Sequence, residues 1–429
     1  MSAKVHLHIK GGPKNGTTFT FTEHDTFIFG RMPDCHACIP DDTQVSRHHF
    51  ILEANPPAAC LRDLGSLNGT WVNGVKFGAR EKGETPELGA KRRYPEVVLK
   101  SGDIIKVGKT SMEVSIEAAK EPQEHRIDPE LADISQLSPE QLARLIFGKP
   151  EDANKAPKLQ IPGYEIQNEI GRGGFGAVYR ARRKQDNAAV AIKLMLSRID
   201  ADDVTYQKFK REVDLTRQLQ HPNIVQFVEH GSDGTVFYFI MEYCDGGNVR
   251  DLMGKNGGRL SITQAKPIIL QALEGLAFAH EKDVVHRDLK PQNILINKGV
   301  ARISDFGLSK NFQQAGLSGM SMTGNYAGSP QFMAREQITN FKYVKPVSDV
   351  WSMGVTIYLM LTGAFPLPFD KKRDPIDVIL NEEMIPIRKR DASISVPVGQ
   401  AVDRALCGRP KERYQSAGEM LLEFKKALA

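Results

Sequence analysis

The stretch His286-Arg-Asp288-Leu-Lys290-Pro-Gln-Asn293 brings a carboxylate, an ammonium group and an amide close together in the chain. Two signatures precede it, Gly171-Arg-Gly173-Gly-Phe-Gly176 and Val190-Ala-Ile-Lys193, and Asp305-Phe-Gly307 follows it. The glycine run alone would also fit a dinucleotide-binding turn or an ordinary loop. The order and spacing of all four signatures remove that ambiguity and indicate one site that is built from all of them.

The composition is that of a globular protein with more than one domain. At 429 residues, with an apolar share of 41%, the chain can supply more than one packed core. The formal charge of +5 arises from 57 basic and 52 acidic side chains without a block of like charges, so nucleic acid is not an implied partner.

The sequence carries no recognisable membrane or export signal. Residues 1–10 lack the apolar core of a signal peptide and are expected to begin a strand. The most apolar stretch, residues 351–365, is shorter than the ~20 residues needed to cross a bilayer and is predicted to be a buried helix. Five cysteines, an odd number, favour a reducing compartment, so we expect a cytoplasmic protein.

Cys35-His-Ala-Cys38 has a spacing that can bind zinc, and His48 and His49 follow nearby. No second cysteine pair completes four ligands, and a strand beginning near Cys38 would turn these side chains to opposite faces. A structural role for the cysteines is therefore favoured over a zinc site.

The chain divides into three parts by pattern. Residues 1–117 show short alternating apolar runs between turn residues, which predicts an all-β sandwich, with an exposed insertion at residues 78–99. Residues 118–161 are polar and rich in proline, which predicts a linker, with a possible short helix at residues 138–147. Residues 162–429 begin with strands and continue mostly as helices.

The four signatures, in this order, resemble those of the protein kinase family over about residues 164–428. The resemblance implies an α+β bilobal kinase fold, with lobes at about residues 162–243 and 248–429, that uses ATP and Mg²⁺. Lys290, two residues after Asp288, and Gly328-Ser329-Pro resemble the serine/threonine class. Glu336 is expected to pair with Arg413, although Arg335 stands where the family usually has proline.

The resemblance assigns catalytic roles to individual side chains. Asp288 would orient the substrate hydroxyl and accept its proton, and Lys290 would neutralise charge on the transferred phosphoryl group. Asn293 and Asp305 would bind Mg²⁺, and Lys193, paired with Glu212, would hold the α and β phosphates.

The nucleotide contacts implied by the resemblance come from the glycine-rich turn, two strands and the hinge between the lobes. The backbone of the hinge would bind adenine, and Asn248 would reach the ribose, although a helix cap explains that asparagine equally well. These residues are Gly171, Gly173, Gly176, Val178, Ala191, Lys193, Glu242, Cys244 and Asn248.

Arg287 precedes the catalytic aspartate, and kinases of this arrangement commonly pair that arginine with a phosphate on the activation segment. The candidate phosphosites in this sequence are Ser318, Ser321 and Thr323.

The first 117 residues resemble a forkhead-associated (FHA) domain, a phosphopeptide-binding module. The resemblance rests on Phe29-Gly30-Arg31, Val45-Ser46-Arg-His-His49, Leu64-Gly-Ser-Leu-Asn68-Gly-Thr70, Asn73-Gly74 and Ser101-Gly-Asp103. It implies that Arg31, Ser46 and Arg47 contact phosphate and that Asn68 contacts the peptide backbone. Leu67 stands where many such domains have a hydroxyl residue, which would remove one phosphate contact.

The combined interpretation is a Hanks-type serine/threonine kinase, in a bacterial style of architecture, that acts on protein substrates. Its FHA domain would bind phosphothreonine in other proteins or in a second copy of the chain. A non-catalytic scaffold is the alternative, and intact Lys193, Asp288, Asn293 and Asp305 count against it. An oxidoreductase fails because a dinucleotide fold requires an acidic residue ~20 positions after the glycine run, within a βαβ unit.

Overall fold

The computed structural model describes residues 3–80, 94–117, 161–173, 176–196, 213, 216–233, 236–306, 330–339, 344–370 and 373–429. The chain divides into two compact units, residues 1–123 with 320–429, and residues 124–319. The domain boundaries inferred from the sequence remain predictions.

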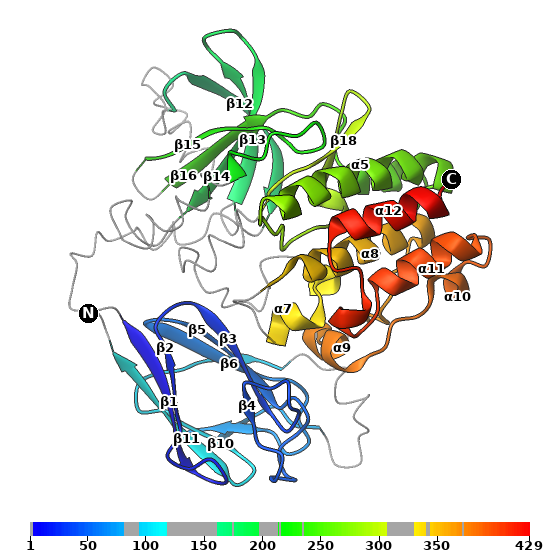
Figure 1. The fold of residues 1–429 in the computed structure, drawn as a ribbon. Helices are drawn as coiled ribbons and strands as arrows, with labels where there is room; N and C mark the ends of the chain where they lie inside the picture. The colour runs from blue at the N-terminus through cyan, green and yellow to red at the C-terminus, as the bar shows by residue number, and fades with distance from the viewer. Residues whose placement is uncertain are drawn as a thin grey trace. The chain divides into compact units, whose positions relative to one another are not determined.

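The β-rich part consists of two sheets that face each other (Figure 1). Its strands are β1 (Lys4–Gly11), β2 (Thr18–Phe21), β3 (Asp25–Gly30), β4 (Ala37–Cys38), β5 (Phe50–Asn55), β6 (Ala58–Asp63), β7 (Thr70–Val72), β8 (Val75–Phe77), β9 (Glu96–Val98), β10 (Ile104–Val107) and β11 (Thr110–Glu117). One sheet has the order β2-β1-β11-β10-β7-β8, and the other has the order β4-β3-β5-β6-β9.

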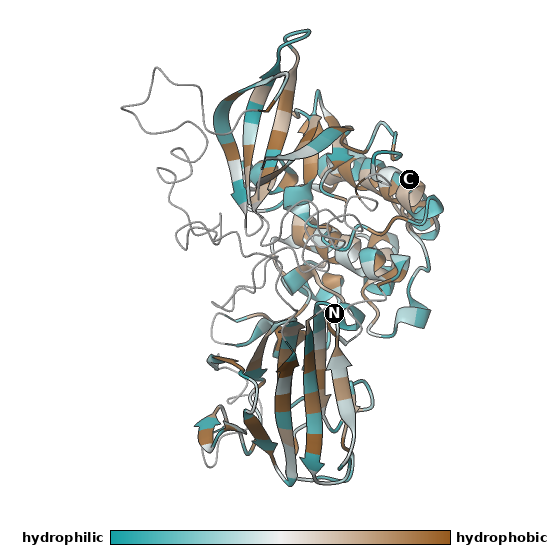
Figure 2. Cartoon of the chain, turned by 90° about the vertical axis from the view of Figure 1, so that its left-hand side faces the viewer, coloured by the Kyte–Doolittle hydropathy of each residue, from teal (hydrophilic) through white to brown (hydrophobic). Residues whose placement is uncertain are grey.

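The alternation of the sequence determines which faces of these strands form the core. Val5, Leu7 and Ile9 of β1 are buried, while His6 and His8 between them point outward to threonine hydroxyls on β2 at 2.9 and 3.0 Å. The same alternation is visible as stripes along the strands in Figure 2. Because each fully buried aliphatic side chain contributes roughly 1.5–3 kcal/mol, a core drawn from both sheets stabilises the sandwich.

The predicted exposed insertion at residues 78–99 is wrong for its last part. Residues 96–98 form β9, which pairs with β6, and Leu99 is buried in the sandwich core. Since Val97 and Leu99 both contact that core, the end of this segment completes a sheet. Residues 81–93, with the basic cluster, lie outside the described residues.

The second unit contains an antiparallel sheet in the order β12-β13-β14-β16-β15. The strands are β12 (Tyr164–Gly173), β13 (Gly176–Arg183), β14 (Ala189–Leu196), β15 (Phe227–Asp233) and β16 (Val236–Glu242). After the sheet come α4 (Val249–Lys255), α5 (Ile262–Glu281), the short η3 (Pro291–Asn293) and the hairpin of β17 (Ile294–Asn297) and β18 (Val300–Ile303).

The remaining helices belong to the first unit. They are η4 (Pro330–Phe332), α7 (Arg335–Thr339), α8 (Pro346–Thr362), α9 (Pro375–Asn381), α10 (Ile387–Arg390), α11 (Val396–Ala405), η6 (Pro410–Glu412) and α12 (Ala417–Ala427). Helices α8, α11 and α12 pack against one another (Figure 1).

Helix α8 confirms the buried helix predicted for the most apolar stretch, although it begins at Pro346 and ends at Thr362. It is buried on all sides, from Val347 to Leu361, as expected for a helix at the centre of a helical core. Gly363 ends it in the left-handed conformation (φ 73°), which glycine adopts without a Cβ penalty. Among the described helices, none is both long and apolar enough to cross a membrane.

Candidate functional site

The segment 286–293 is folded tightly around Asp288. Lys290 Nζ lies 2.8 Å from Asp288 Oδ2, and Asn293 Nδ2 donates to the Asp288 carbonyl at 2.8 Å and to Oδ2 at 3.3 Å. The short helix η3, which begins at Pro291, turns the chain so that Asn293 lies next to Asp288. His286 is fully buried, and its Nε2 lies 2.8 Å from the Ser304 carbonyl. The carboxylate of Asp288 is therefore held in one orientation, and the segment that carries it is anchored by the buried His286.

Two residues of this site have left-handed backbone conformations, Arg287 (φ 68°) and Asp305 (φ 60°). Neither is glycine, so each conformation costs about 1–3 kcal/mol and persists only because the surroundings impose it. Strain of this kind is concentrated at functional sites.

Asp305 pairs with Lys193 of β14, with 3.0 Å between Nζ and Oδ1. Burial alone would raise the pKa of Asp305, but the charge and hydrogen bond of Lys193 outweigh it and hold that pKa below its ordinary value. Asp305 is therefore ionised at neutral pH, as a Mg²⁺ ligand must be. Asn293 uses its amide nitrogen on Asp288, so its oxygen is the atom left for a cation, and both side chains fit Mg²⁺.

The glycine-rich turn joins β12 to β13 as a hairpin. Gly173 pairs with Gly176, and Val178 of β13 pairs with Lys193 of β14. Gly176 has φ 142°, and a Cβ there would lie 1.9 Å from the Leu194 carbonyl oxygen. Only glycine fits at this position, so the hairpin backbone can approach the strand that carries Lys193.

The hinge after β16 is anchored on the β17–β18 hairpin by a side-chain network. The Glu242 carboxylate accepts hydrogen bonds from Arg302 and from Asn297 Nδ2, each at 2.6 Å. Because two arms of the same hairpin hold one carboxylate, the direction of the chain at the end of β16 is fixed. The Glu242–Arg302 pair is an interaction that the sequence reasoning missed, since Arg302 belongs to none of the signatures.

Main-chain hydrogen bonds continue this anchoring along the hinge. The N–H of Gly246 donates to the Ile296 carbonyl and that of Ile296 donates to Gly247, both at 2.9 Å. Arg180 of β13 lies over the Tyr243 ring at 5.2 Å.

The side chain of Asn248 caps α4 by accepting from the Asp251 N–H at 2.9 Å, which confirms the helix-cap interpretation. Its contact with a ribose stays a prediction.

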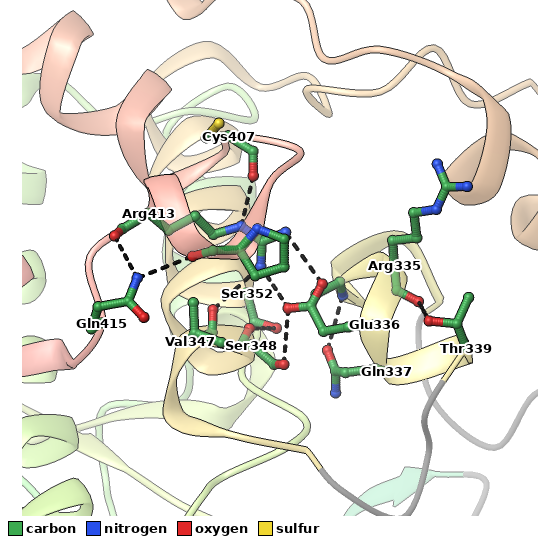
Figure 3. Close-up of polar contacts among 12 residues, drawn as sticks. Arg335, Glu336, Gln337, Thr339, Val347, Ser348, Ser352, Cys407, Arg413 and Gln415 are labelled. Carbon is green, nitrogen blue, oxygen red and sulfur yellow. Dashed lines mark hydrogen bonds and ion pairs between the residues drawn. The ribbon is translucent and has the colours of Figure 1, made fainter. Parts of the chain in front are cut away.

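The predicted ion pair between Glu336 and Arg413 is present (Figure 3). The two guanidinium nitrogens lie 2.6 and 3.2 Å from the carboxylate oxygens, and Arg413 Nε donates to the Cys407 carbonyl at 2.7 Å. The Arg413 side chain is only 1% exposed and stacks on the Trp351 ring, so breaking this pair would cost about 3–5 kcal/mol.

Arg335 is the first residue of α7. Proline is common at this position, because the backbone N–H of the first helical residue has no acceptor within the helix. The preceding N–H, of Ala334, donates to Gln337 Oε1 at 2.9 Å, so a side-chain cap orders this end of the helix. The adjoining Glu336–Arg413 pair fixes the same turn.

In the sandwich, the loops that carry Arg31, Ser46, Arg47 and Asn68 are brought together. Arg31, Ser46 and Arg47 line one pocket, and Ser46 Oγ accepts the Leu67 N–H at 2.9 Å. Asn68 Nδ2 donates to the Gln44 carbonyl at 2.7 Å. Arg80 lines the same pocket, and the sequence reasoning missed it because it stands beyond the quoted motifs.

Two buried groups hold these loops in shape. A Cβ at Gly30 would lie 2.2 Å from the Arg47 carbonyl oxygen, so the loops approach closely only because residue 30 is glycine. Burial lowers the pKa of His49, whose neutral ring accepts the Ser46 N–H at 3.0 Å and contacts the Gly69 carbonyl at 3.1 Å.

The zinc alternative at Cys35 and Cys38 is not supported by the chemistry of the donors. Asp34, Cys35 and His48 lie within 4.8 Å of one another, but the Asp34 carboxylate is 3.1 Å from His48 Nε2. Burial raises the pKa of Cys35 to about 12, and its thiol donates to the Arg47 carbonyl at 3.4 Å. These contacts fit the structural role predicted for Cys35, and the absence of zinc stays a prediction.

Several predicted site residues lie outside the described residues. They are Glu212, Ser318, Ser321 and Thr323.

Comparison with known proteins agrees with this arrangement. The Protein kinase domain family matches residues 164–423, and the FHA domain family matches residues 27–108. The first match spans more than half of the chain. The chain belongs to the protein kinase family. It also carries an FHA domain at its N-terminal side.

Individual relatives are plant and bacterial kinases. The chain is 38% identical over 248 residues to CBL-interacting protein kinase 21 of Oryza sativa subsp. japonica, covering 57% of this chain and 45% of that protein. It is 33% identical over 265 residues to serine/threonine-protein kinase PknB of Mycobacterium leprae, covering 60% and 42%. The chain thus spans less than half the length of either relative.

One solved structure similar in fold is the kinase domain of PknI from Mycobacterium tuberculosis, crystallised as a point mutant. The TM-score is 0.50 at 19% identity, covering 63% of this chain and 98% of that one. This likeness supports the kinase fold.

The hinge anchor yields a measurable prediction. We expect Arg302→Met to weaken ADP binding by about three- to tenfold, because the partly exposed Glu242 pair no longer fixes the hinge. Isothermal titration calorimetry with ADP and Mg²⁺ measures this change. Arg183→Met is the matched control, since it breaks an ion pair of 2.6 Å in the five-stranded sheet that contains Glu242. Equal losses in both variants would contradict a specific role for Arg302.

The hinge cysteine gives a second prediction. Burial, followed by the negative charge of Glu242, raises the pKa of Cys244 to about 12. At pH 8 only about one thiol in 10⁴ is then ionised, against about one in ten at the ordinary pKa of 9.0.

Iodoacetamide should therefore modify Cys244 about a thousandfold more slowly in the native protein than in urea, with a rate that rises as pH approaches 12. Peptide mass spectrometry follows the reaction at this residue. Equal rates in native and unfolded protein would show that the thiol is not buried as described.

Proposed function

We propose that this protein is an active serine/threonine kinase that transfers the γ-phosphoryl group of ATP to hydroxyl groups of proteins. The observation that carries the proposal is the fixed Asp288 carboxylate. Oδ2 of Asp288 is held by Lys290 and Asn293, while Oδ1 accepts no hydrogen bond from the residues that the structure describes. Oδ1 is then the atom that receives the proton of the substrate hydroxyl.

The side chains around Asp288 supply the charges that phosphoryl transfer requires. Lys290, 2.8 Å from Asp288, orients the base and balances the charge of the transferred group. Lys193 holds the α and β phosphates, and Asp305 with Asn293 would bind Mg²⁺, which neutralises phosphate charge when present. Since the reaction needs positioning and charge stabilisation more than covalent chemistry, these groups suffice.

The hinge provides the adenine contacts in this proposal. The Glu242 carbonyl would accept from the base, because the Glu242 N–H already donates to the Gln226 carbonyl at 2.9 Å, and the Cys244 N–H would donate to the base. Gly171, Gly173 and Gly176 let the turn approach the phosphates. The anchoring of Glu242 by Arg302 and Asn297 supports this assignment, because a fixed backbone binds a rigid base at lower entropic cost.

We further propose that the FHA domain binds phosphothreonine in protein partners. The convergence of Arg31, Ser46 and Arg47 on one pocket supports this function, because guanidinium and hydroxyl groups are strong donors to phosphate. Asn68 would bind the peptide backbone.

Autophosphorylation would provide one such partner. Thr323 in the activation segment is the proposed internal site, with Ser318 and Ser321 as alternatives, and a phosphate there would pair with Arg287. After phosphorylation, the FHA domain of one copy would bind Thr323 of a second copy.

The five cysteines are free, which supports a reducing compartment such as the cytoplasm.

Loss of the catalytic base tests the kinase proposal. We expect Asp288→Asn to lower phosphate incorporation from labelled ATP with Mg²⁺ by about 10²–10⁴-fold, the usual contribution of a general base. Mass spectrometry maps the phosphates of the wild-type chain. Asp41→Asn, an exposed change of the same kind in the sandwich, is the control.

A wild-type chain that incorporates no more phosphate than Asp288→Asn, into itself or into a generic protein substrate, would favour the non-catalytic scaffold instead.

Self-association tests the internal ligand. After incubation with ATP, we expect the wild-type chain to form dimers in analytical ultracentrifugation, and we expect both Thr323→Ala and Arg31→Ala to remain monomeric. Thr323→Ser is the matched control, because it keeps a phosphorylatable hydroxyl but lacks the methyl group that FHA domains favour. Phosphorylation-dependent dimers of Thr323→Ala would rule out Thr323 as the ligand.

A further inference from the structure

The phosphopeptide pocket of this FHA domain lacks one expected hydroxyl group. Leu67 stands beside Asn68 where many FHA domains have serine or threonine, and its apolar side chain is 52% exposed. Its backbone N–H is already used, since it donates to Ser46 Oγ at 2.9 Å. Residue 67 therefore orients Ser46 through its backbone but offers phosphate no side-chain donor.

A cation that belongs to none of the FHA motifs lies next to this position. Arg80 follows β8, and its backbone N–H donates to the Ser66 carbonyl at 2.9 Å. The turn at Gly69 packs on the same segment, since a Cβ there would lie 2.8 Å from the Gly78 carbonyl oxygen. Arg80 is thus attached directly to the loop that carries Leu67 and Asn68.

The surroundings of the Arg80 side chain favour binding of an anion. Arg80 lines the same pocket as Arg31, Ser46 and Arg47. Within the described residues, the buried Nε atoms of Arg80 and Arg31 have no hydrogen-bond partner. Asp377 and Glu382 also line this pocket, but both carboxylates pair with Arg373, at 3.0 and 2.7 Å, so the guanidinium groups of Arg31, Arg47 and Arg80 still repel each other. A buried charged donor without an acceptor is costly. A dianionic phosphate removes both penalties, because guanidinium groups donate to phosphate in charge-assisted pairs.

We infer that Arg80 is a phosphate-binding residue of this FHA domain and supplies the contact that Leu67 cannot. The inference rests on the proposed phosphothreonine binding and extends it to a residue outside the FHA motifs. It also predicts that the affinity for the phosphopeptide depends more strongly on the second negative charge of the phosphate than it would with a hydroxyl contact. A guanidinium interacts with the charge of the phosphate, while a neutral hydroxyl depends mainly on hydrogen-bond geometry.

The test is a double-mutant cycle on the full chain. Fluorescence anisotropy measures binding of a synthetic peptide with the sequence of residues 317–329, phosphorylated at Thr323, to wild type, Arg80→Gln, Leu67→Thr and the double variant. Lys106→Gln is the matched control, because it removes one exposed positive charge from β10 of the same sandwich. Inorganic phosphate at equal concentration separates recognition of the peptide from capture of the free ion.

We expect Arg80→Gln to weaken peptide binding by about ten- to hundredfold, the range for a lost hydrogen bond to a charged group. Leu67→Thr should restore part of this loss in the Arg80→Gln background, while Lys106→Gln should bind as wild type. Rescue by Leu67→Thr distinguishes a lost phosphate contact from misfolding, because this substitution supplies the missing hydroxyl and leaves residue 80 unchanged.

The outcomes separate the inference from the function on which it rests. A wild-type chain that binds no phosphothreonine peptide overturns both. A wild-type chain that binds, with Arg80→Gln equal to it or with a loss that Leu67→Thr leaves unchanged, overturns the role of Arg80 alone. If inorganic phosphate at equal concentration displaces the peptide, the pocket captures a free anion, which contradicts the proposed recognition of phosphothreonine peptides.

Discussion

The ion pair between Lys193 and Asp305 is the constraint on which the kinase site depends. Lys193 is fixed by the pairing of β14 with its neighbours, and Asp305 follows β18 in a strained left-handed conformation. Their contact at 3.0 Å links the sheet to the segment around Asp288. Both side chains are largely shielded from water, so their attraction is stronger than that of an exposed ion pair.

The same principle recurs at two other places, where an arginine and a glutamate join parts of the chain that are far apart in sequence. Arg302 holds the hinge through Glu242, and Arg413 holds the start of α7 through Glu336. Arg413 also orders the backbone next to it, since its Nε donates to the Cys407 carbonyl. In both pairs the planar guanidinium fixes the direction of the carboxylate. The sites are therefore rigid where strands and helices end, which is where chemistry or binding needs precise backbone positions.

The sequence predicted much of this because the signatures are local. The segment 286–293 and the glycine-rich turn each fold on themselves, so their residue order already implies a shape. The Glu242–Arg302 pair and the place of Arg80 were not predictable, because they depend on which loops the sheets bring together. Leu99 shows the same limit, since its burial depends on the pairing of β9 with β6, which composition did not reveal.

The two sites differ in how their charges are balanced, and this difference explains what each is suited to bind. In the kinase site, Lys193 and Lys290 each have a carboxylate within 3.0 Å, so the charges of both ammonium groups are balanced before any nucleotide enters. Such a site suits a ligand that arrives with its own cation, because the incoming charges largely cancel. In the FHA pocket, among the described residues, the buried Nε atoms of Arg31 and Arg80 have no acceptor. Asp377 and Glu382 line the same pocket, but both pair with Arg373, so Arg31, Arg47 and Arg80 keep the pocket positive, as the proposed binding of a phosphate dianion requires.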